Sequence, residues 1–330
     1  MTILGMNRRN ALIQRYNSRE AIKGVNQKFR TKERLAAAGV PVPKTIALIQ
    51  DEEELANLCF DELPDAFALK PDRGRRGEGV ILVDGRTHDG WKQLSGKTLT
   101  HEMLTRHLHR ILQGELSLDS TISDAALFEP LIRTHPAFAR LVPVGLPDIR
   151  IICLRDVPLM AMTRLPTLES GGRANLHQGA VGAAIDFKNG QIFRAMLGDQ
   201  EIEYHPSTDQ LLVGECIPHW EDAVRAARRC SAALDLGYIG VDIVIDANEG
   251  AQVLECNAYP GLEIQNVNGA GLAARLDMVE RRARLRQRRL QRRDQRQGQP
   301  LGQVLPALAR KANLLAAQLR EVWHTPVAHA

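Results

Sequence analysis

Several features that would place the chain in a special class are missing. None of its apolar runs approaches the ~20 residues that a membrane-spanning helix needs. The first 17 residues are polar and basic, without the apolar centre of a secretory signal peptide. Five cysteines are scattered without CxxC spacing, which argues against a zinc knuckle or a disulfide framework. We therefore expect a cytoplasmic protein of ordinary globular composition without a transmembrane segment.

Common catalytic and nucleotide-binding signatures are also absent. The sequence shows neither GxGxxG after a strand nor a GKS/T phosphate loop, and no convincing Ser-His-Asp or Cys-His set. The sequence therefore offers no evident side-chain nucleophile.

Charge is distributed unevenly. The net charge is +4, but residues 281–296 hold nine arginines and one acid, so this segment carries about +8 and the rest about −4. Such a segment has few apolar residues with which to join a core, and its like charges repel along a helix. It predicts either an anionic partner at Arg281 to Arg296 or a solvated linker. Residues 301–323 are amphipathic again and predict a further helix.

Two apolar, β-branched runs, residues 240–245 and 252–257, flank an Asn- and Gly-containing turn and predict an antiparallel hairpin. A turn centred near residues 248 and 249 places Asp242 opposite Glu255, and alternation places Asn257 on the face of Glu255. Like charges across a ladder repel unless a cation lies between them. Carboxylate and amide oxygens suit Mg²⁺ or Mn²⁺. The alternative is a surface hairpin with solvated acids.

A loop rich in glycine and arginine follows a predicted strand at residues 67–70. Gly74, Gly77 and Gly79 would let backbone N–H groups approach phosphate oxygens, and Lys70 at the strand end could reach the same phosphates. Alone, this loop is a weak indication of phosphate binding. The presence of the acidic hairpin in the same chain makes the indication stronger.

The order of elements predicts an α+β protein with mostly antiparallel strands. We expect helices at residues 26–38, 51–59, 100–113 and 220–236, and hairpins at 148–164 and 180–196. His101, His107 and His109 favour a solvated helix face over a metal set. The predicted division is a short N-terminal segment (1–25), a main domain (26–275) with a small subdomain at about 50–127, and an arginine-rich, helical C-terminal extension (276–330).

Taken in the order in which they occur along the chain, these motifs resemble those of the ATP-grasp ligases. The resemblance is greatest to the RimK type, the ribosomal-protein glutamate ligases. The resemblance covers residues 26–269 and is most specific in residues 173–177 and 255–263. It implies a nucleotide clasped between two α+β subdomains. The implied ATP-binding residues are Lys28, Lys70, Gly74, Gly77, Gly79 and Glu129, with Glu129 near adenine and ribose. The implied metal ligands are Asp242, Glu255 and Asn257, and the implied catalytic residues are Arg150, Arg173 and Asn175.

The resemblance also implies ATP-dependent joining of a small-molecule or peptide carboxylate to an amine through an acyl phosphate. Two alternatives stay open: another ATP-grasp small-molecule ligation, and a non-catalytic ATP-binding regulator or scaffold. The chain departs from the family pattern in two ways, because few residues precede Lys28 and because the arginine-rich segment is additional.

Overall fold

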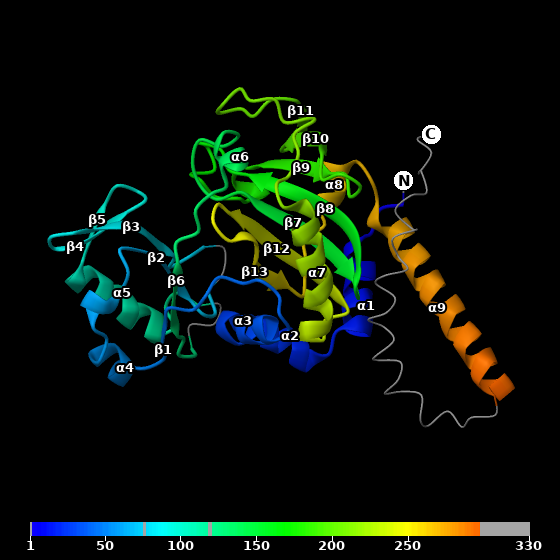
Figure 1. The fold of residues 1–330 in the computed structure, drawn as a ribbon, viewed down its shortest axis with the longest axis horizontal. Helices are drawn as coiled ribbons and strands as arrows, with labels where there is room; N and C mark the ends of the chain where they lie inside the picture. The colour runs from blue at the N-terminus through cyan, green and yellow to red at the C-terminus, as the bar shows by residue number, and fades with distance from the viewer. Residues whose placement is uncertain (1, 75–76, 118–120, 298–330) are drawn as a thin grey trace.

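The computed structural model describes residues 2–74, 77–117 and 121–297. These residues form two lobes, each built on an antiparallel sheet with helices packed on it (Figure 1). Among them, no helix combines the length and the apolar character needed to cross a membrane.

The smaller lobe contains a six-stranded sheet in the order β1-β6-β2-β3-β4-β5. Its strands are β1 (Ala47–Ile49), β2 (Ala66–Pro71), β3 (Ile81–Thr87), β4 (Gly90–Gln93), β5 (Thr98–Thr100) and β6 (Ala126–Pro130). Helices α4 (Glu52–Ala56), η1 (Phe60–Glu62) and α5 (His101–Leu112) accompany it. Helix α5 buries Leu104, Leu108 and Ile111, whose spacing forms one apolar face against the sheet.

The larger lobe contains a seven-stranded sheet in the order β11-β10-β9-β8-β7-β12-β13. Its strands are β7 (Asp148–Leu154), β8 (Val157–Leu165), β9 (Val181–Ile185), β10 (Ile192–Leu197), β11 (Gln200–Ile202), β12 (Tyr238–Asp246) and β13 (Gly250–Asn257). Every residue of β12 is buried, because this strand lies between two neighbours and under side chains on both faces.

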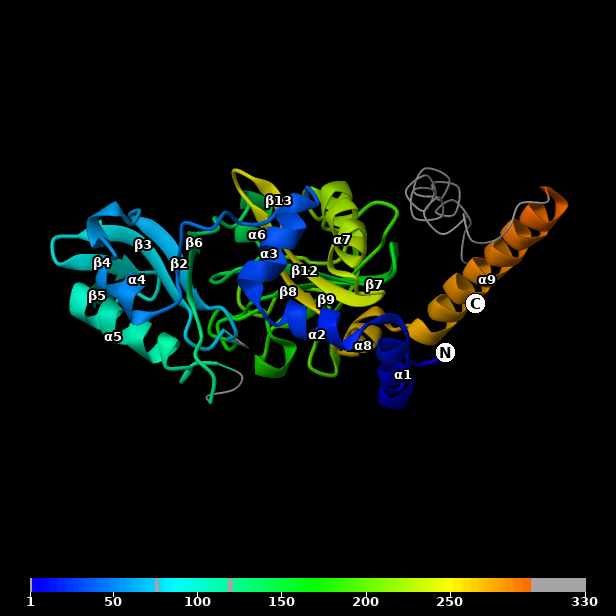
Figure 2. The same ribbon diagram turned by 90° about the horizontal axis from the view of Figure 1, so that it is seen from below.

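Helices cover the large sheet on both faces (Figure 2). One core cluster joins the sheet to α2 (Arg19–Val25), α3 (Lys28–Ala37) and α7 (Trp220–Leu234). The other joins it to α1 (Met6–Tyr16), α8 (Ile264–Asn268) and the start of α9 (Leu272–Gln297). Two short helices, α6 (Pro136–Ala139) and η2 (Leu176–Gln178), lie in the connections.

The first 25 residues contribute two helices to the large lobe. Leu12 and Ile13 of α1 are buried in the second core cluster, beside residues of α8 and α9. The Gln265 side chain accepts a hydrogen bond from the Leu4 backbone N–H at 2.8 Å and donates one to the Leu4 carbonyl. The beginning of the chain is thereby tied to a segment about 260 residues further on.

The predicted fold class, α+β with two lobes, is confirmed. The hairpins expected around residues 155–158 and 188–190 are present, as is the acidic hairpin β12–β13. The arginine-rich segment continues α9 as helix to Gln297. The helix expected at residues 301–323 lies outside the described residues.

We expect Ile13→Ala to lower the free energy of unfolding by about 2–5 kcal/mol, because Ile13 is only 1% exposed and truncation leaves a cavity. Urea denaturation measures this change. Ile3→Ala is the matched control, since Ile3 is 63% exposed and its truncation should change the value by less than about 0.5 kcal/mol. Equal effects of the two substitutions would show that α1 does not pack on the sheet in solution.

Candidate active site

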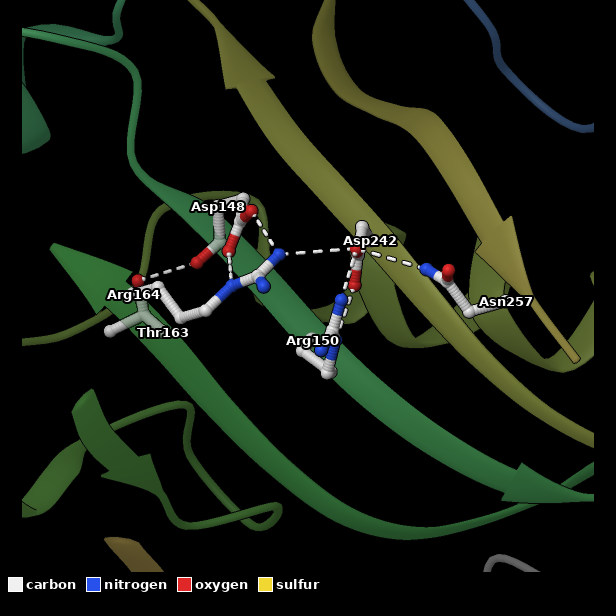
Figure 3. Close-up of polar contacts among 6 residues, drawn as sticks. All are labelled: Asp148, Arg150, Thr163, Arg164, Asp242 and Asn257. Atoms are coloured by element: carbon white, nitrogen blue, oxygen red, sulfur yellow. Dashed lines mark hydrogen bonds and ion pairs between the residues drawn. The ribbon is translucent and has the colours of Figure 1, made fainter. Parts of the chain in front are cut away.

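The centre of the site is an ion pair between neighbouring strands. Arg150 on β7 lies directly opposite Asp242 on β12. Its Nε donates to Asp242 Oδ1 at 2.7 Å and its Nη2 donates to Oδ2 at 2.6 Å (Figure 3). Both side chains lie on the sheet face that carries Ile152 and Tyr238 further along, because side chains alternate along each strand. The apolar half of this face packs under helices, and the polar half forms the site.

A second arginine extends this pair into a network. Arg164 on β8 lies opposite Asp148 on β7 and donates to both of its carboxylate oxygens. The same guanidinium also donates to Asp242 Oδ2 at 3.1 Å (Figure 3). Two arginines thus bridge two buried carboxylates across three neighbouring strands.

The two carboxylates have different pKa values because they share the arginines unequally. Burial alone would raise the pKa of Asp242, but the charges of Arg150 and Arg164 outweigh it and hold that pKa at about 2. Burial raises the pKa of Asp148 to about 6, because Arg164 alone contacts it directly and the charge of Asp242 opposes its ionisation. At neutral pH, Asp242 is therefore firmly ionised.

Strand β13 adds two oxygen-bearing side chains. Glu255 lies opposite Asp242 in the ladder, as the sequence predicts, and the Asn257 amide donates to Asp242 Oδ2 at 3.2 Å. Within the described residues, the Glu255 carboxylate makes neither a hydrogen bond nor an ion pair. The surrounding protein atoms keep water away from this carboxylate and so raise its pKa, and the negative charge of Asp242 raises it further. A cation placed here would relieve that repulsion.

The chemistry of this donor set limits which metal it could hold. In the described part of the chain, three or more His, Cys, Asp or Glu side chains nowhere gather in a way that could hold a metal ion. A metal at Asp242 and Glu255 would therefore also need the Asn257 amide oxygen, water and phosphate oxygens. Mg²⁺ is commonly held in that way, by one or two carboxylates with water and substrate phosphates.

Lys28, the first residue of α3, connects the glycine-rich loop with the acidic hairpin. Its ammonium donates to the backbone carbonyls of Asp72, at 3.1 Å, and of Gly74. Burial lowers the pKa of Lys28, and the nearby charges of Glu255 and Asp72 oppose this shift. The side chain that would bind phosphate therefore lies within electrostatic reach of the predicted metal ligand Glu255.

Two further contacts shape the glycine-rich loop. Gly79 has φ +72°, and a Cβ there would come within 2.8 Å of Pro71, so only glycine fits without rearrangement. The Gly79 carbonyl lies 2.8 Å from His107 Nε2 on α5. Burial lowers the pKa of His107, so its neutral ring is the donor in this contact. The solvated face expected for the helix histidines is therefore wrong for His107.

Lys70 belongs to a buried charge cluster on the small sheet. Glu129 on β6 accepts from Lys70 on β2 at 2.6 Å and also from Lys32 on α3. Burial alone would raise the pKa of Glu129, but the two ammonium charges outweigh it and lower that pKa. Burial lowers the pKa of Lys32 and the charge of Lys70 adds to this shift, while Glu129 opposes it. The Glu129 carboxylate thus forms ion pairs with two lysines.

Arg173 and Asn175 lie in the connection between β8 and β9. Asn175 Oδ1 accepts from the His177 backbone N–H at 3.1 Å and caps the short helix η2. Within the described residues, the Arg173 side chain is exposed and makes neither a hydrogen bond nor an ion pair. The structure brings Arg150, Asp242, Glu255 and Asn257 together, whereas no direct contact joins Arg173 or Asn175 to them.

Sequence reasoning missed Lys32 and Arg164. Lys32 lies one helical turn after Lys28 and therefore on the same face of α3, which is a signal that the spacing offered. Arg164 lies opposite Asp148 once the hairpin β7–β8 is placed in register. No local pattern pointed to Asp124, whose carboxylate accepts from the Arg73 backbone N–H at 3.0 Å.

Two lobes, each built on an antiparallel sheet, agree with the predicted ATP-grasp fold. A family model described as sugar-transfer associated ATP-grasp matches residues 7–281, and the chain belongs to this family.

Curated relatives agree with the resemblance to glutamate ligases. A probable alpha-L-glutamate ligase from Mannheimia succiniciproducens is 27% identical over 250 residues, which are 76% of this chain and 61% of the relative. A protein of the same name from Haemophilus influenzae is 25% identical over 266 residues, 80% of this chain and 66% of the relative. The chain therefore matches less than two thirds of the length of these relatives.

Solved structures show a more distant likeness. The ATP complex of D-alanine–D-alanine ligase from Bacillus anthracis matches with 16% identity and a TM-score of 0.46, covering 82% of this chain and 69% of that chain.

We expect Glu129→Gln to lower the free energy of unfolding by about 3–5 kcal/mol, because Lys32 and Lys70 would keep two poorly compensated charges in a buried place. Urea denaturation at neutral pH measures the loss. Glu102→Gln is the control: Glu102 is 80% exposed and pairs with Arg106 on the surface, so its loss should stay below about 1 kcal/mol. A Glu129 variant as stable as the control would mean that the three charges do not interact in solution.

Proposed function

We propose that this protein is an ATP-dependent ligase that joins a carboxylate to an amine. One observation carries the proposal. Lys28 donates to the glycine-rich loop and lies within electrostatic reach of Glu255, beside the Arg150–Asp242 pair. Phosphate-binding and metal-binding groups are needed together where a nucleotide reacts. The names of the relatives favour glutamate as the first substrate to test.

The residues divide into three roles. Lys28, Lys70 and the backbone of Gly74, Gly77 and Gly79 bind the phosphates of ATP. Glu129 is a positioning residue, because its carboxylate holds Lys70 in place. Arg150, Arg173 and Asn175 face the γ-phosphate and the developing oxyanion, which cationic and amide donors stabilise.

Mg²⁺ or Mn²⁺ fits the side chains of Asp242, Glu255 and Asn257. Support comes from the repulsion that raises the pKa of Glu255 and from the hard oxygen donors. When bound, the metal would offset the charge of the phosphates. The substrate carboxylate takes the γ-phosphoryl group and becomes an acyl phosphate, and the amine then displaces phosphate to form the amide. Use of ATP in this way supports a cytoplasmic location.

With ATP and Mg²⁺, ADP release should rise when the correct carboxylate is added, and hydroxylamine should convert the acyl phosphate into a hydroxamate. L-glutamate comes first in a screen of amino acids and small peptides. Glu255→Ala should reduce both signals by about 10²-fold or more while thermal unfolding stays unchanged. Glu249→Ala, an exposed position in the turn of the same hairpin, is the control and should keep full activity.

The outcome separates the competing functions. ADP release without hydroxamate for every carboxylate indicates a simple ATPase. Binding of ATP without turnover indicates a regulator or scaffold. Full activity of Glu255→Ala would remove Glu255 from the metal site.

A further prediction concerns Arg150, whose guanidinium occupies the position of a cation beside Asp242. Removing its charge should strengthen the attraction of Asp242 and Glu255 for a free divalent ion. Two unit charges ~4 Å apart in a medium of moderate polarity interact by about 4 kcal/mol. An increase in metal affinity of about tenfold corresponds to a modest part of that energy. We expect Arg150→Met to bind Mn²⁺ about tenfold more tightly than the unmodified protein in the absence of nucleotide.

Electron paramagnetic resonance of free Mn²⁺ measures this affinity without any turnover. Arg194→Met is the control, because Arg194 pairs with Glu201 elsewhere on the large sheet and its loss should not change the affinity. Weaker Mn²⁺ binding by Arg150→Met than by the control contradicts the idea that arginine and metal compete for Asp242.

A further inference from the structure

Helix α9 has a buried beginning and an exposed continuation. Leu272, Ala273 and Leu276 are in the core, and Glu280 is the last buried residue, where it binds Arg15 and Tyr16. Beyond Glu280, none of the described side chains of α9 is buried. Both views show this half projecting away from the two lobes (Figures 1 and 2).

The exposed half carries an unbalanced positive charge. Residues 281–296 contain nine arginines, no lysine and a single acid. Among the described arginine side chains of this half, Arg284 alone has an ion pair, with Glu280 at 3.6 Å. The others are Arg281, Arg282, Arg286, Arg288 and Arg289. These charges repel one another along the helix, so a polyanion would stabilise the segment.

The arginines share one side of the helix. At 3.6 residues per turn, the six whose side chains the structure describes fall within an arc of about 200°. Among the described side chains, the remaining arc contains Ala283, Gln287, Leu290 and Gln291, which is too little apolar surface for insertion into a bilayer. The segment therefore presents a wide cationic face without an apolar counterpart.

We propose that residues 281–291 bind double-stranded DNA, with this part of the helix lying in the major groove and its six arginines on the phosphates of both groove walls. A helix with its side chains is about 10–12 Å wide and the major groove of B-form DNA about 12 Å, so the two fit. Arginine binds phosphate through two parallel N–H donors, which suits a face whose described charged side chains are all arginine.

Other polyanions fit this face less well. The major groove of A-form RNA is deep and narrow, and a flat lipid surface meets only part of a 200° arc, roughly half by the same helical geometry. The rest of the chain carries about −4 and repels nucleic acid, so binding is confined to the projecting helix. The proposal is independent of the ligase activity.

Fluorescence anisotropy of a labelled 20-base-pair DNA duplex with the full chain tests the proposal. If about six arginines neutralise phosphates, the logarithm of the affinity should fall with the logarithm of salt concentration with a slope near −5, about a thousandfold between 50 and 200 mM salt. Replacing Arg282, Arg286 and Arg289 by Gln should bring the slope to about −3 and weaken binding at least tenfold at 50 mM salt. The same three positions changed to Lys should stay within about fivefold, because the charge remains.

The control variant removes three arginine charges from another part of the protein. Arg19, Arg106 and Arg225 are exposed on the body of the protein, and their replacement by Gln should leave both affinity and slope unchanged. Equal weakening in this control overturns the assignment to α9. Tighter binding of a 20-base-pair RNA duplex, of vesicles with 30% anionic phosphatidylglycerol, or of polyglutamate than of DNA overturns the choice of partner.

Discussion

The balance of charge around Asp242 is the constraint on which the site depends. Asp242 is buried on β12, between β7 and the edge strand β13, and three donors from three different strands reach its carboxylate: Arg150, Arg164 and Asn257. A buried carboxylate without such partners would take up a proton rather than stay charged. The network keeps it ionised with a pKa of about 2, and so keeps a negative charge ready beside Glu255. The same network connects β8, β7, β12 and β13 at this end of the sheet.

The small sheet and helix α3 have the opposite requirement, because together they hold positive charge in a place with little water. Lys32 and Lys70 share the carboxylate of Glu129, and Lys28 is held by backbone carbonyls of Asp72 and Gly74. Each lysine is thus oriented before any anion arrives, which lowers the entropy that binding would otherwise lose. Because α3 packs on the large lobe and also supplies Lys32 to the small sheet, it links the two charged sets. Their proximity is seen in the influence of Glu255 on the pKa of Lys28.

Local patterns were sufficient for much of this arrangement. Centring the turn near residues 248 and 249 places Asp242 opposite Glu255 from the sequence. In the structure the pairs next to the turn are centred on residue 248, and an irregularity between Asp242 and Ile243 brings Glu255 opposite Asp242. Arg164 required the register of a longer hairpin that contains an irregularity between Ile152 and Cys153. The Lys32–Glu129 pair joins residues 97 positions apart, and the contact of Leu4 with Gln265 spans 261 positions. Such contacts leave no local pattern, because they depend on how finished elements pack against one another.

The arginines of this chain illustrate how burial decides their role. Arg150 and Arg164 are largely buried, and each is fully matched by carboxylates, so their charge is internal to the fold. The described arginines of α9 beyond Glu280 have almost no carboxylate partners and lie in solvent. A folded domain gains nothing from unmatched like charges along one helix, because their mutual repulsion opposes its formation. The segment therefore contributes little to the stability of the two lobes, and its charge is available to a molecule outside them.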